Sequence, residues 1–239
     1  MLNRIVFVAL LAGGLAGLLT SALQQLLVVP LIQRAEVYEA APMHHDMAAA
    51  AAPSKPLATS TADHTADTAA STGFDVKRAA ITTVATVGAA VGFTLMLLAV
   101  MQALGEPITT SHALAWGAAG FAVAGLAPAL GLAPELPGSA SGDLNLRQLW
   151  WAGTAASTAL GLWLVFRNRA SWALPLGALL LAAPHIIGAP QPSMLTSTVP
   201  AELASAFVAR SLAIQAIFWV LIGGLAGYFW SRGETTRAA

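Results

Sequence analysis

Long apolar runs alternate with short polar segments along most of the chain. The first run, residues 5–29, is interrupted only by two hydroxyl and two amide side chains. A run of 18 or more apolar residues can cross roughly 30 Å of hydrocarbon as a helix. The pattern therefore predicts an all-α polytopic membrane protein, with one transmembrane domain over residues 1–239. The predicted helices cover residues 5–29, 79–104, 113–132, 148–166, 172–187 and 203–230.

Two of these elements have competing interpretations. The run after Arg4 resembles a signal peptide, but it exceeds the 7–15 apolar residues of a signal core and no small-x-small cleavage site follows it directly. We expect it to be a retained helix. The segment 172–187 is about 16 residues long, carries Pro175 and runs into Pro184. Six membrane-spanning helices are predicted, and five remain possible.

One long segment, residues 34–78, differs from the rest of the chain. It is rich in Ala, Thr, Ser and Pro, and it contains His44, His45 and His64, three of the five histidines, as well as several carboxylates. Such a composition cannot bury a core of its own. We therefore expect a flexible loop that carries His and Asp on the outer side of the membrane.

The orientation follows from the basic residues of the short loops, which concentrate on the cytoplasmic side. A cytoplasmic N-terminus and six helices place both termini in the cytoplasm and most acidic residues outside, so the outer face attracts cations. The basic residues expected inside are Arg4, Arg167, Arg169, Arg232 and Arg237.

Composition narrows the class of protein further. Apolar residues make up 57% and charged residues 9%, whereas a soluble domain has about 25% charged residues. The formal net charge is zero, which gives no indication of nucleic-acid binding. Because cysteine is absent, disulfides and thiolate metal sites are excluded. A metal ion would need nitrogen, oxygen or methionine sulfur ligands.

The densest group of candidate metal ligands is His44-His45-Asp46, together with His64 in the same loop. Imidazole and carboxylate suit divalent ions such as cobalt, nickel and zinc. Adjacent histidines in a low-complexity segment also arise by composition alone. The acid-rich outer face favours the metal-binding interpretation.

Two further candidates lie at the ends of predicted helices. His185, between Pro184 and Gly188, could coordinate an ion at an outer mouth with Glu135 or Glu202, or it could hydrogen-bond a carbonyl that Pro184 frees. On the inner side, His112 with Glu106 could receive the ion, although a helix N-terminus also explains this pair. The last group at membrane depth consists of polar residues that could simply join helices: Thr94, Ser157, Thr158 and Gln215.

Several classes of activity find no support in the chain. The lysines lack the context of a phosphate-binding loop, and neither H-E-x-x-H nor G-x-S-x-G occurs, so no enzyme and no bound cofactor are predicted. No charged residue lies at mid-membrane, which argues against a proton-relay pump.

Three G-x-x-x-G pairs, which let helix backbones approach closely, predict helix contacts within the chain, with a partner or in a homo-oligomer. Glycine is also common in such helices. The pairs are Gly13 and Gly17, Gly88 and Gly92, and Gly223 and Gly227.

Several motifs give the chain a family resemblance over nearly its whole length. They are Gln24-Gln-Leu-Leu-Val-Val-Pro-Leu31, Ala35-Glu-Val-Tyr-Glu39, the loop histidines His44 and His45, the Pro-rich segment from Leu126 to Gly138, Arg147-Gln-Leu-Trp-Trp151, Pro184-His-Ile-Ile-Gly-Ala-Pro190 and Val199-Pro-Ala-Glu-Leu203. With these motifs the sequence resembles the CbtA family of predicted cobalt transporter subunits.

The resemblance implies uptake of a divalent cation, cobalt, across a bacterial inner membrane in support of cobalamin synthesis. It also implies a small single-span CbtB-type partner with its own histidine motif. One rival function is a non-transporting scaffold or metal-delivery subunit of a larger complex. A membrane enzyme with a histidine-bound metal is a second rival, but the chain lacks carboxylate–histidine pairs at helical spacing on the inner side.

Overall fold

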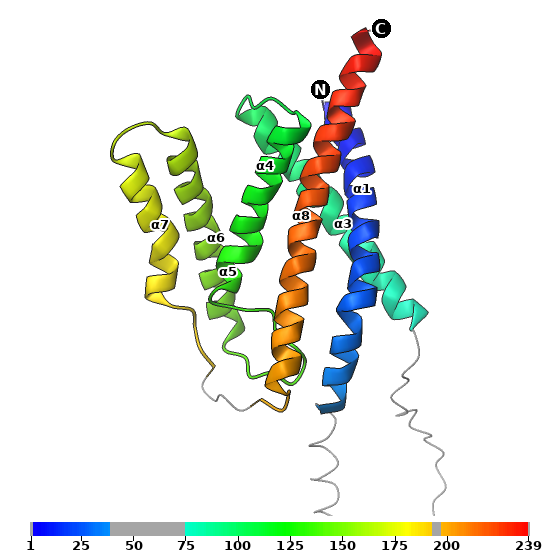
Figure 1. Cartoon of the computed structure of the whole chain (residues 1–239), viewed down its shortest axis with the longest axis vertical. Coiled ribbons are helices and arrows are strands. Elements are labelled where there is room, and N and C mark those ends of the chain that lie inside the picture. Colours follow the sequence, from blue (N-terminus) through cyan, green and yellow to red (C-terminus); the bar gives the residue numbers. More distant parts are fainter. Residues whose placement is uncertain (1, 39–74, 193–196, 239) are drawn as a thin grey trace, which may run out of the picture.

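The computed structural model describes residues 2–38, 75–192 and 197–238, and within these ranges every regular element is a helix (Figure 1). The predicted all-α class is confirmed. The elements are α1 (Leu2–Leu27), α3 (Val76–Ala103), α4 (Thr110–Phe121), the π-helical turn η1 (Ala122–Leu126), α5 (Ala127–Ala129), α6 (Leu144–Arg167), α7 (Ala173–Ile187) and α8 (Ala201–Ala238).

The helices run up and down, and the N-terminus and the C-terminus lie at the same end of the bundle, at the top of Figure 1. We call this the termini end. The opposite end, where residues 38 and 75 lie, is the loop end. Among the described residues, five helical stretches are long and apolar enough to cross a membrane. The apolar helix α7 is shorter, with 15 residues, or about 22 Å at 1.5 Å per residue. This length is less than the roughly 30 Å of hydrocarbon, so a sixth span stays a prediction.

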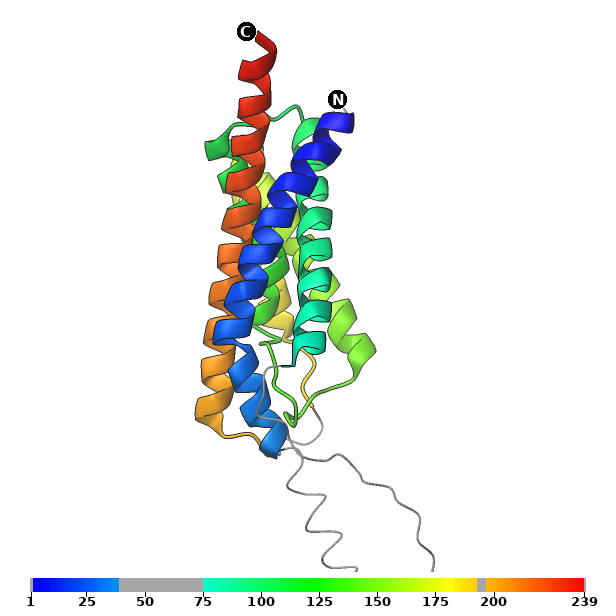
Figure 2. The ribbon, with the colours of Figure 1, turned by 90° about the vertical axis from the view of Figure 1, so that its right-hand side faces the viewer.

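The core lies among α1, α3, α4 and α8. Helix α1 packs against both α3 and α8, and α8 packs against α4, an arrangement that Figure 2 shows from the side. Helices α6 and α7 form a hairpin beside this body, and α6 contacts η1 and α5.

The three G-x-x-x-G pairs have different environments. A Cβ atom added at Gly17 would lie 2.6 Å from the Cα of Val87 on α3, and one added at Gly227 would lie 2.6 Å from the Cα of Thr110. In contrast, nothing lies within 4 Å of the Cβ position at Gly88 or Gly92. The first and last pairs therefore form close helix contacts inside the bundle, whereas the middle pair does not.

Two prolines shape the helices differently from the prediction. The predicted helix 113–132 is divided, because Pro128 lacks an N–H and its ring would clash with the carbonyl group four residues earlier. The chain widens into η1 just before it. Near the N-terminus, α1 ends at Leu27, and a further helix covers residues 29–38. Pro30 lies in the first turn of that helix, where its missing N–H leaves no helical bond unmade.

Candidate functional site

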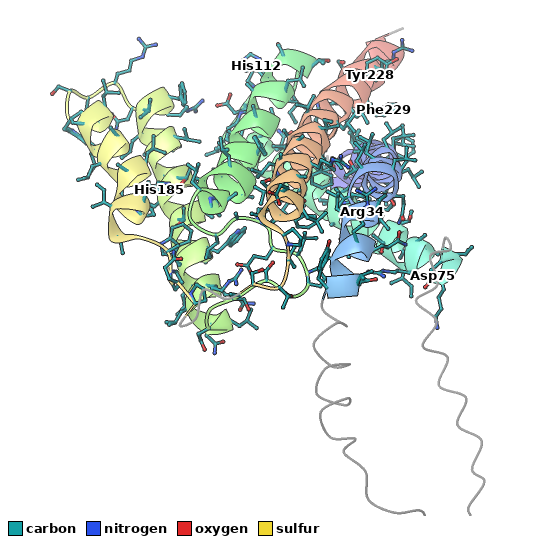
Figure 3. All side chains as sticks on the ribbon, turned by 60° about the horizontal axis from the view of Figure 1, so that its bottom comes forward. Arg34, Asp75, His112, His185, Tyr228 and Phe229 are labelled. Atoms are coloured by element: carbon teal, nitrogen blue, oxygen red, sulfur yellow. The ribbon has the colours of Figure 1, made fainter. Side chains whose placement is uncertain are left out.

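The predicted ligands of the long loop, His44, His45, Asp46 and His64, lie outside the described residues. The other candidates are distributed over both ends of the bundle (Figure 3). His185 lies in the last turn of α7 at the loop end, and its exposed ring meets the ring of Trp150 edge-on, with the centroids 6.2 Å apart. Glu202, also exposed, lies in the first turn of α8 at the same end.

The inner candidates lie at the termini end. His112 is exposed near the start of α4, and its Nδ1 atom is 3.0 Å from the hydroxyl oxygen of Thr109, which caps that helix. The Glu106 carboxylate forms an ion pair with the guanidinium of Arg167. Glu106, which lies between α3 and α4, is therefore paired with a basic residue at the end of α6.

These side chains do not assemble a metal centre. Within residues 2–38, 75–192 and 197–238, no group of three or more His, Asp or Glu side chains could hold a metal ion. Glu135, predicted to act with His185, instead accepts a hydrogen bond from Arg147 at 2.7 Å. An ion-binding site within the helical bundle would therefore have to use groups other than clustered His, Asp and Glu side chains.

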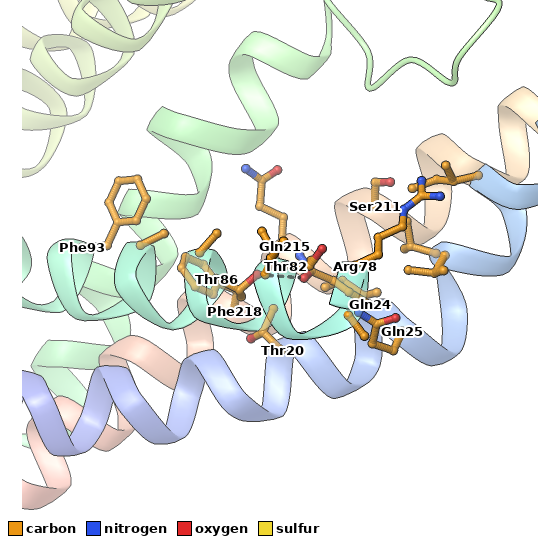
Figure 4. A pocket seen from close by; sticks show the side chains of 18 of the residues that line it. Thr20, Gln24, Gln25, Arg78, Thr82, Thr86, Phe93, Ser211, Gln215 and Phe218 are labelled. Carbon is orange, nitrogen blue, oxygen red and sulfur yellow. Dashed lines mark hydrogen bonds between the residues drawn. The ribbon is translucent and has the colours of Figure 1, made fainter. Parts of the chain in front are cut away.

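A cavity of about 820 Å³, with a largely apolar lining that also carries several polar side chains, lies between α1, α3 and α8 in the loop-end half of the bundle (Figure 4). Part of its polar lining comes in pairs spaced four residues apart, and such pairs share one face of a helix; Gln25, Gln33, Asp75 and Arg78 also line the cavity. Each of the three helices supplies one pair: Thr20 and Gln24, Thr82 and Thr86, Ser211 and Gln215. The spacing places the two members of each pair on one face of their helix, and in the folded bundle these faces line the cavity.

Hydrogen bonds fix part of this polar wall. The hydroxyl group of Thr86 donates to Oε1 of Gln24 at 3.1 Å, and the hydroxyl groups of Ser21 and Thr83 lie 2.7 Å apart beside it. The hydroxyl oxygen of Thr20 is buried and has no hydrogen-bond partner among the described residues. These hydrogen bonds join α1 and α3, while the Thr20 hydroxyl group remains without a hydrogen bond.

Aromatic rings close the cavity toward the termini end. The ring of Phe93 lies 5.2 Å from that of Trp219 and 6.1 Å from that of Phe218, measured between centroids, and all three residues line the cavity. Phe218 and Trp219 are buried. We call Phe93, Phe218 and Trp219 the aromatic plug.

Charged residues surround the loop end of the cavity. Asp75 caps α3 by accepting a hydrogen bond from the backbone N–H of Arg78 at 3.1 Å, and both residues line the cavity. The guanidinium of Arg78 also donates to the carboxylate of Glu36 at 2.6 Å. Because Glu36 and Asp75 precede and follow residues 39–74, this ion pair anchors both ends of the histidine-bearing loop beside the cavity.

A second cavity of about 640 Å³ lies beside α5 and α6 and contains Glu135 and Arg147. Gln215, Trp151 and Ala124 line both cavities. Gln215 therefore lies at the junction of the two cavities, opposite η1. Sequence reasoning treated Gln215 only as a residue that joins helices, although its spacing from Ser211 and its position on an apolar helix carry the signal.

A family model described as "Probable cobalt transporter subunit (CbtA)" matches residues 2–231. No curated protein matches the chain significantly, and neither does any solved structure.

Proposed function

Since the chain belongs to the CbtA family of probable cobalt transporter subunits, we propose that it carries Co²⁺ into the cell across the bacterial inner membrane, in support of cobalamin synthesis. A transporter subunit works within a complex, and a small single-span CbtB-type protein is the proposed partner.

The observation that carries this proposal is the group of polar side chains in the cavity between α1, α3 and α8. This cavity reaches from the ion pair of Glu36 and Arg78 at the loop end to the aromatic plug deeper in the bundle. A cavity lined by eight hydroxyl and amide side chains inside an apolar bundle is costly unless something polar occupies it. Irregular or polar structure at membrane depth is tolerated where it lines a water-filled path.

The charge distribution supports an inward direction of transport. The basic residues Arg4, Arg167, Arg169, Arg232 and Arg237 lie at the termini end, whereas at the loop end Arg34, Lys77 and Arg78 flank the long loop and only Arg147 and Arg210 lie near the short connections. Since basic residues concentrate on the cytoplasmic side, the termini end faces the cytoplasm and the cavity opens to the periplasm. A divalent ion that crosses a potential of 100 mV then gains about 4.6 kcal/mol.

In the proposed path, His44, His45 and Asp46, with His64, capture the ion from the periplasm. Neutral imidazole coordinates such ions, and carboxylates add charge. The loop delivers the ion to the cavity because its ends are anchored there. His185 and Glu202 lie at the same end as the cavity opening, with Glu135 in the neighbouring cavity, and His112 lies at the end where the ion is released.

The proposal is tested by reconstituting the purified chain in vesicles that contain a metal-sensitive dye and adding Co²⁺ outside. We expect dye quenching that accelerates when the interior is made negative. Replacing His44 and His45 with Ala should slow uptake at low Co²⁺, whereas saturating Co²⁺ should restore most of the rate, since the loop only raises the local ion concentration.

The word "subunit" in the family description favours one alternative, a scaffold or metal-delivery subunit that does not itself transport. The dye in vesicles that contain the chain alone would then stay unquenched after Co²⁺ is added, and quenching would occur only when the partner is present. Equal uptake with and without the partner would contradict this alternative.

A further inference from the structure

We infer that the cavity between α1, α3 and α8 binds the divalent cation with its water shell intact, through the oxygens of Gln24, Thr86 and Gln215. This inference rests on the proposed function and specifies where and in which form the ion is held within the bundle.

The size of the cavity fits a hydrated ion. Six water molecules at about 30 Å³ each occupy roughly 180 Å³, and the cavity has a volume of about 820 Å³. An octahedral hydrated cation therefore enters with room for further water. The ion does not need to lose its inner shell in order to reach the aromatic plug.

The chemistry of the lining points the same way. A bare transition-metal ion is held by imidazole or carboxylate ligands, and no group of three such side chains occurs among the described residues. Amide and hydroxyl oxygens accept hydrogen bonds, which is what metal-bound water molecules donate. Neutral groups also hold the ion weakly enough to release it, a condition for rapid passage.

Gln215 has the most distinctive position in this lining. A Cβ atom added at Gly125 would lie 2.8 Å from Oε1 of Gln215, so the amide lies directly over the glycine of η1. The π-helical turn and the missing side chain at Gly125 together leave room for this amide at the junction of the two cavities. Single π-turns inside α-helices occur frequently at functional sites.

Electron paramagnetic resonance with Mn²⁺ tests the inference on the purified full chain in lipid nanodiscs. Mn²⁺ reports the protons of its bound water and the nitrogen of any imidazole ligand. His44, His45, Asp46 and His64 are replaced with Ala in every sample, so that the loop offers no direct ligands. We expect a bound Mn²⁺ that keeps its full set of water ligands and shows no nitrogen coupling.

Gln215→Leu should weaken this binding about tenfold, since it removes one of the three oxygen-bearing groups that accept hydrogen bonds from the metal-bound water. The matched control is Gln102→Leu, a half-buried glutamine on α3 that lines neither cavity, and it should bind as the parent does. Gly125→Ala displaces the Gln215 amide without removing it and should also weaken binding. This variant keeps the test possible if Gln215→Leu fails to fold. Cobalt(III) hexaammine, which cannot exchange its ligands, should compete with Mn²⁺.

Nitrogen coupling, loss of water ligands, no competition by the hexaammine, or equal binding by the parent, Gln215→Leu and Gly125→Ala would each overturn the inference. Binding is measured without transport, so the two proposals fail separately. A chain that binds hydrated Mn²⁺ in the cavity but moves no Co²⁺ in vesicles, with or without its partner, would overturn the proposed function alone.

Discussion

The carboxylate of Glu36 and the guanidinium of Arg78 are joined by a hydrogen bond of 2.6 Å between positions 42 residues apart in the sequence. Glu36 lies at the end of the helix that follows α1, and Arg78 lies in the first turn of α3. The pair connects the two ends of residues 39–74 at the loop end of the cavity between α1, α3 and α8. In the proposed transport path it holds the metal-capturing segment where the ion has to enter.

Removing this tether should change the apparent affinity for metal more than the stability. Both side chains are more than 40% exposed, and exposed ion pairs contribute only about 0.2–1 kcal/mol. We expect Glu36→Gln to raise the Co²⁺ concentration that gives half-maximal uptake severalfold, with an unchanged maximal rate and melting temperature. Exchanging the charges, with Glu36→Arg and Arg78→Glu together, should restore part of the loss. A lower maximal rate with normal affinity would contradict a tethering role.

Two buried threonines provide a matched comparison at the cavity wall. The hydroxyl oxygens of Thr20 and Thr154 are both buried without a hydrogen-bond partner among the described residues, but Thr20 lines the cavity and Thr154 lies on α6 away from it. Replacing an unpaired buried hydroxyl with a methyl group of similar shape is nearly neutral or stabilising. Thr20→Val and Thr154→Val should therefore both keep or raise the melting temperature, and only Thr20→Val should slow Co²⁺ uptake. Equal uptake rates would remove Thr20 from the path.

The sequence predicts the class of this fold well and its functional surfaces poorly, for one physical reason. A long apolar run predicts a membrane-spanning helix whatever the other helices of the protein are, so the all-helical membrane class follows directly from the sequence. The pairs Thr20 and Gln24 or Ser211 and Gln215 are visible as spacings. However, only the packing of α1 against α3 and α8 turns separate polar faces into one cavity.

The π-helical turn illustrates the same limit. Pro128 predicts an irregularity in the helix, but proline is compatible both with the end of a helix and with a kink inside it. The outcome here is a widened turn that places Gly125 under the amide of Gln215. The contact of this turn with Gln215 on α8 joins positions about 90 residues apart, so no local pattern in the sequence reveals it.

The aromatic plug should limit leakage through the bundle. Phe93 packs on both Phe218 and Trp219, so a smaller aliphatic residue at that position leaves a gap between the cavity and the termini end. We expect Phe93→Leu to increase the passive leak of Mg²⁺ into vesicles, measured with a fluorescent indicator. The control is Phe7→Leu, because Phe7 is 61% exposed on α1 and lies outside the plug and the cavity lining. A leak that rises equally in both variants would indicate general loosening of the bundle.

The last prediction uses two glycines that belong to identical sequence patterns but have opposite environments. A methyl group at Gly17 would lie 2.6 Å from the backbone of Val87, which cannot move aside as a side chain can, whereas nothing lies within 4 Å of the same position at Gly88. Overpacking of this kind costs about 1–3 kcal/mol, and replacing an exposed helical glycine with alanine gains about 1 kcal/mol.

Gly17→Ala should therefore lower the melting temperature of the purified protein, and Gly88→Ala should keep or raise it. Because Gly17 is already enclosed by α3, a homo-oligomer through this glycine would require the two helices to separate. If Gly17→Ala instead leaves the melting temperature unchanged while a dimer seen by cross-linking disappears, then Gly17 contacts another chain, and the close packing of α1 against α3 is wrong.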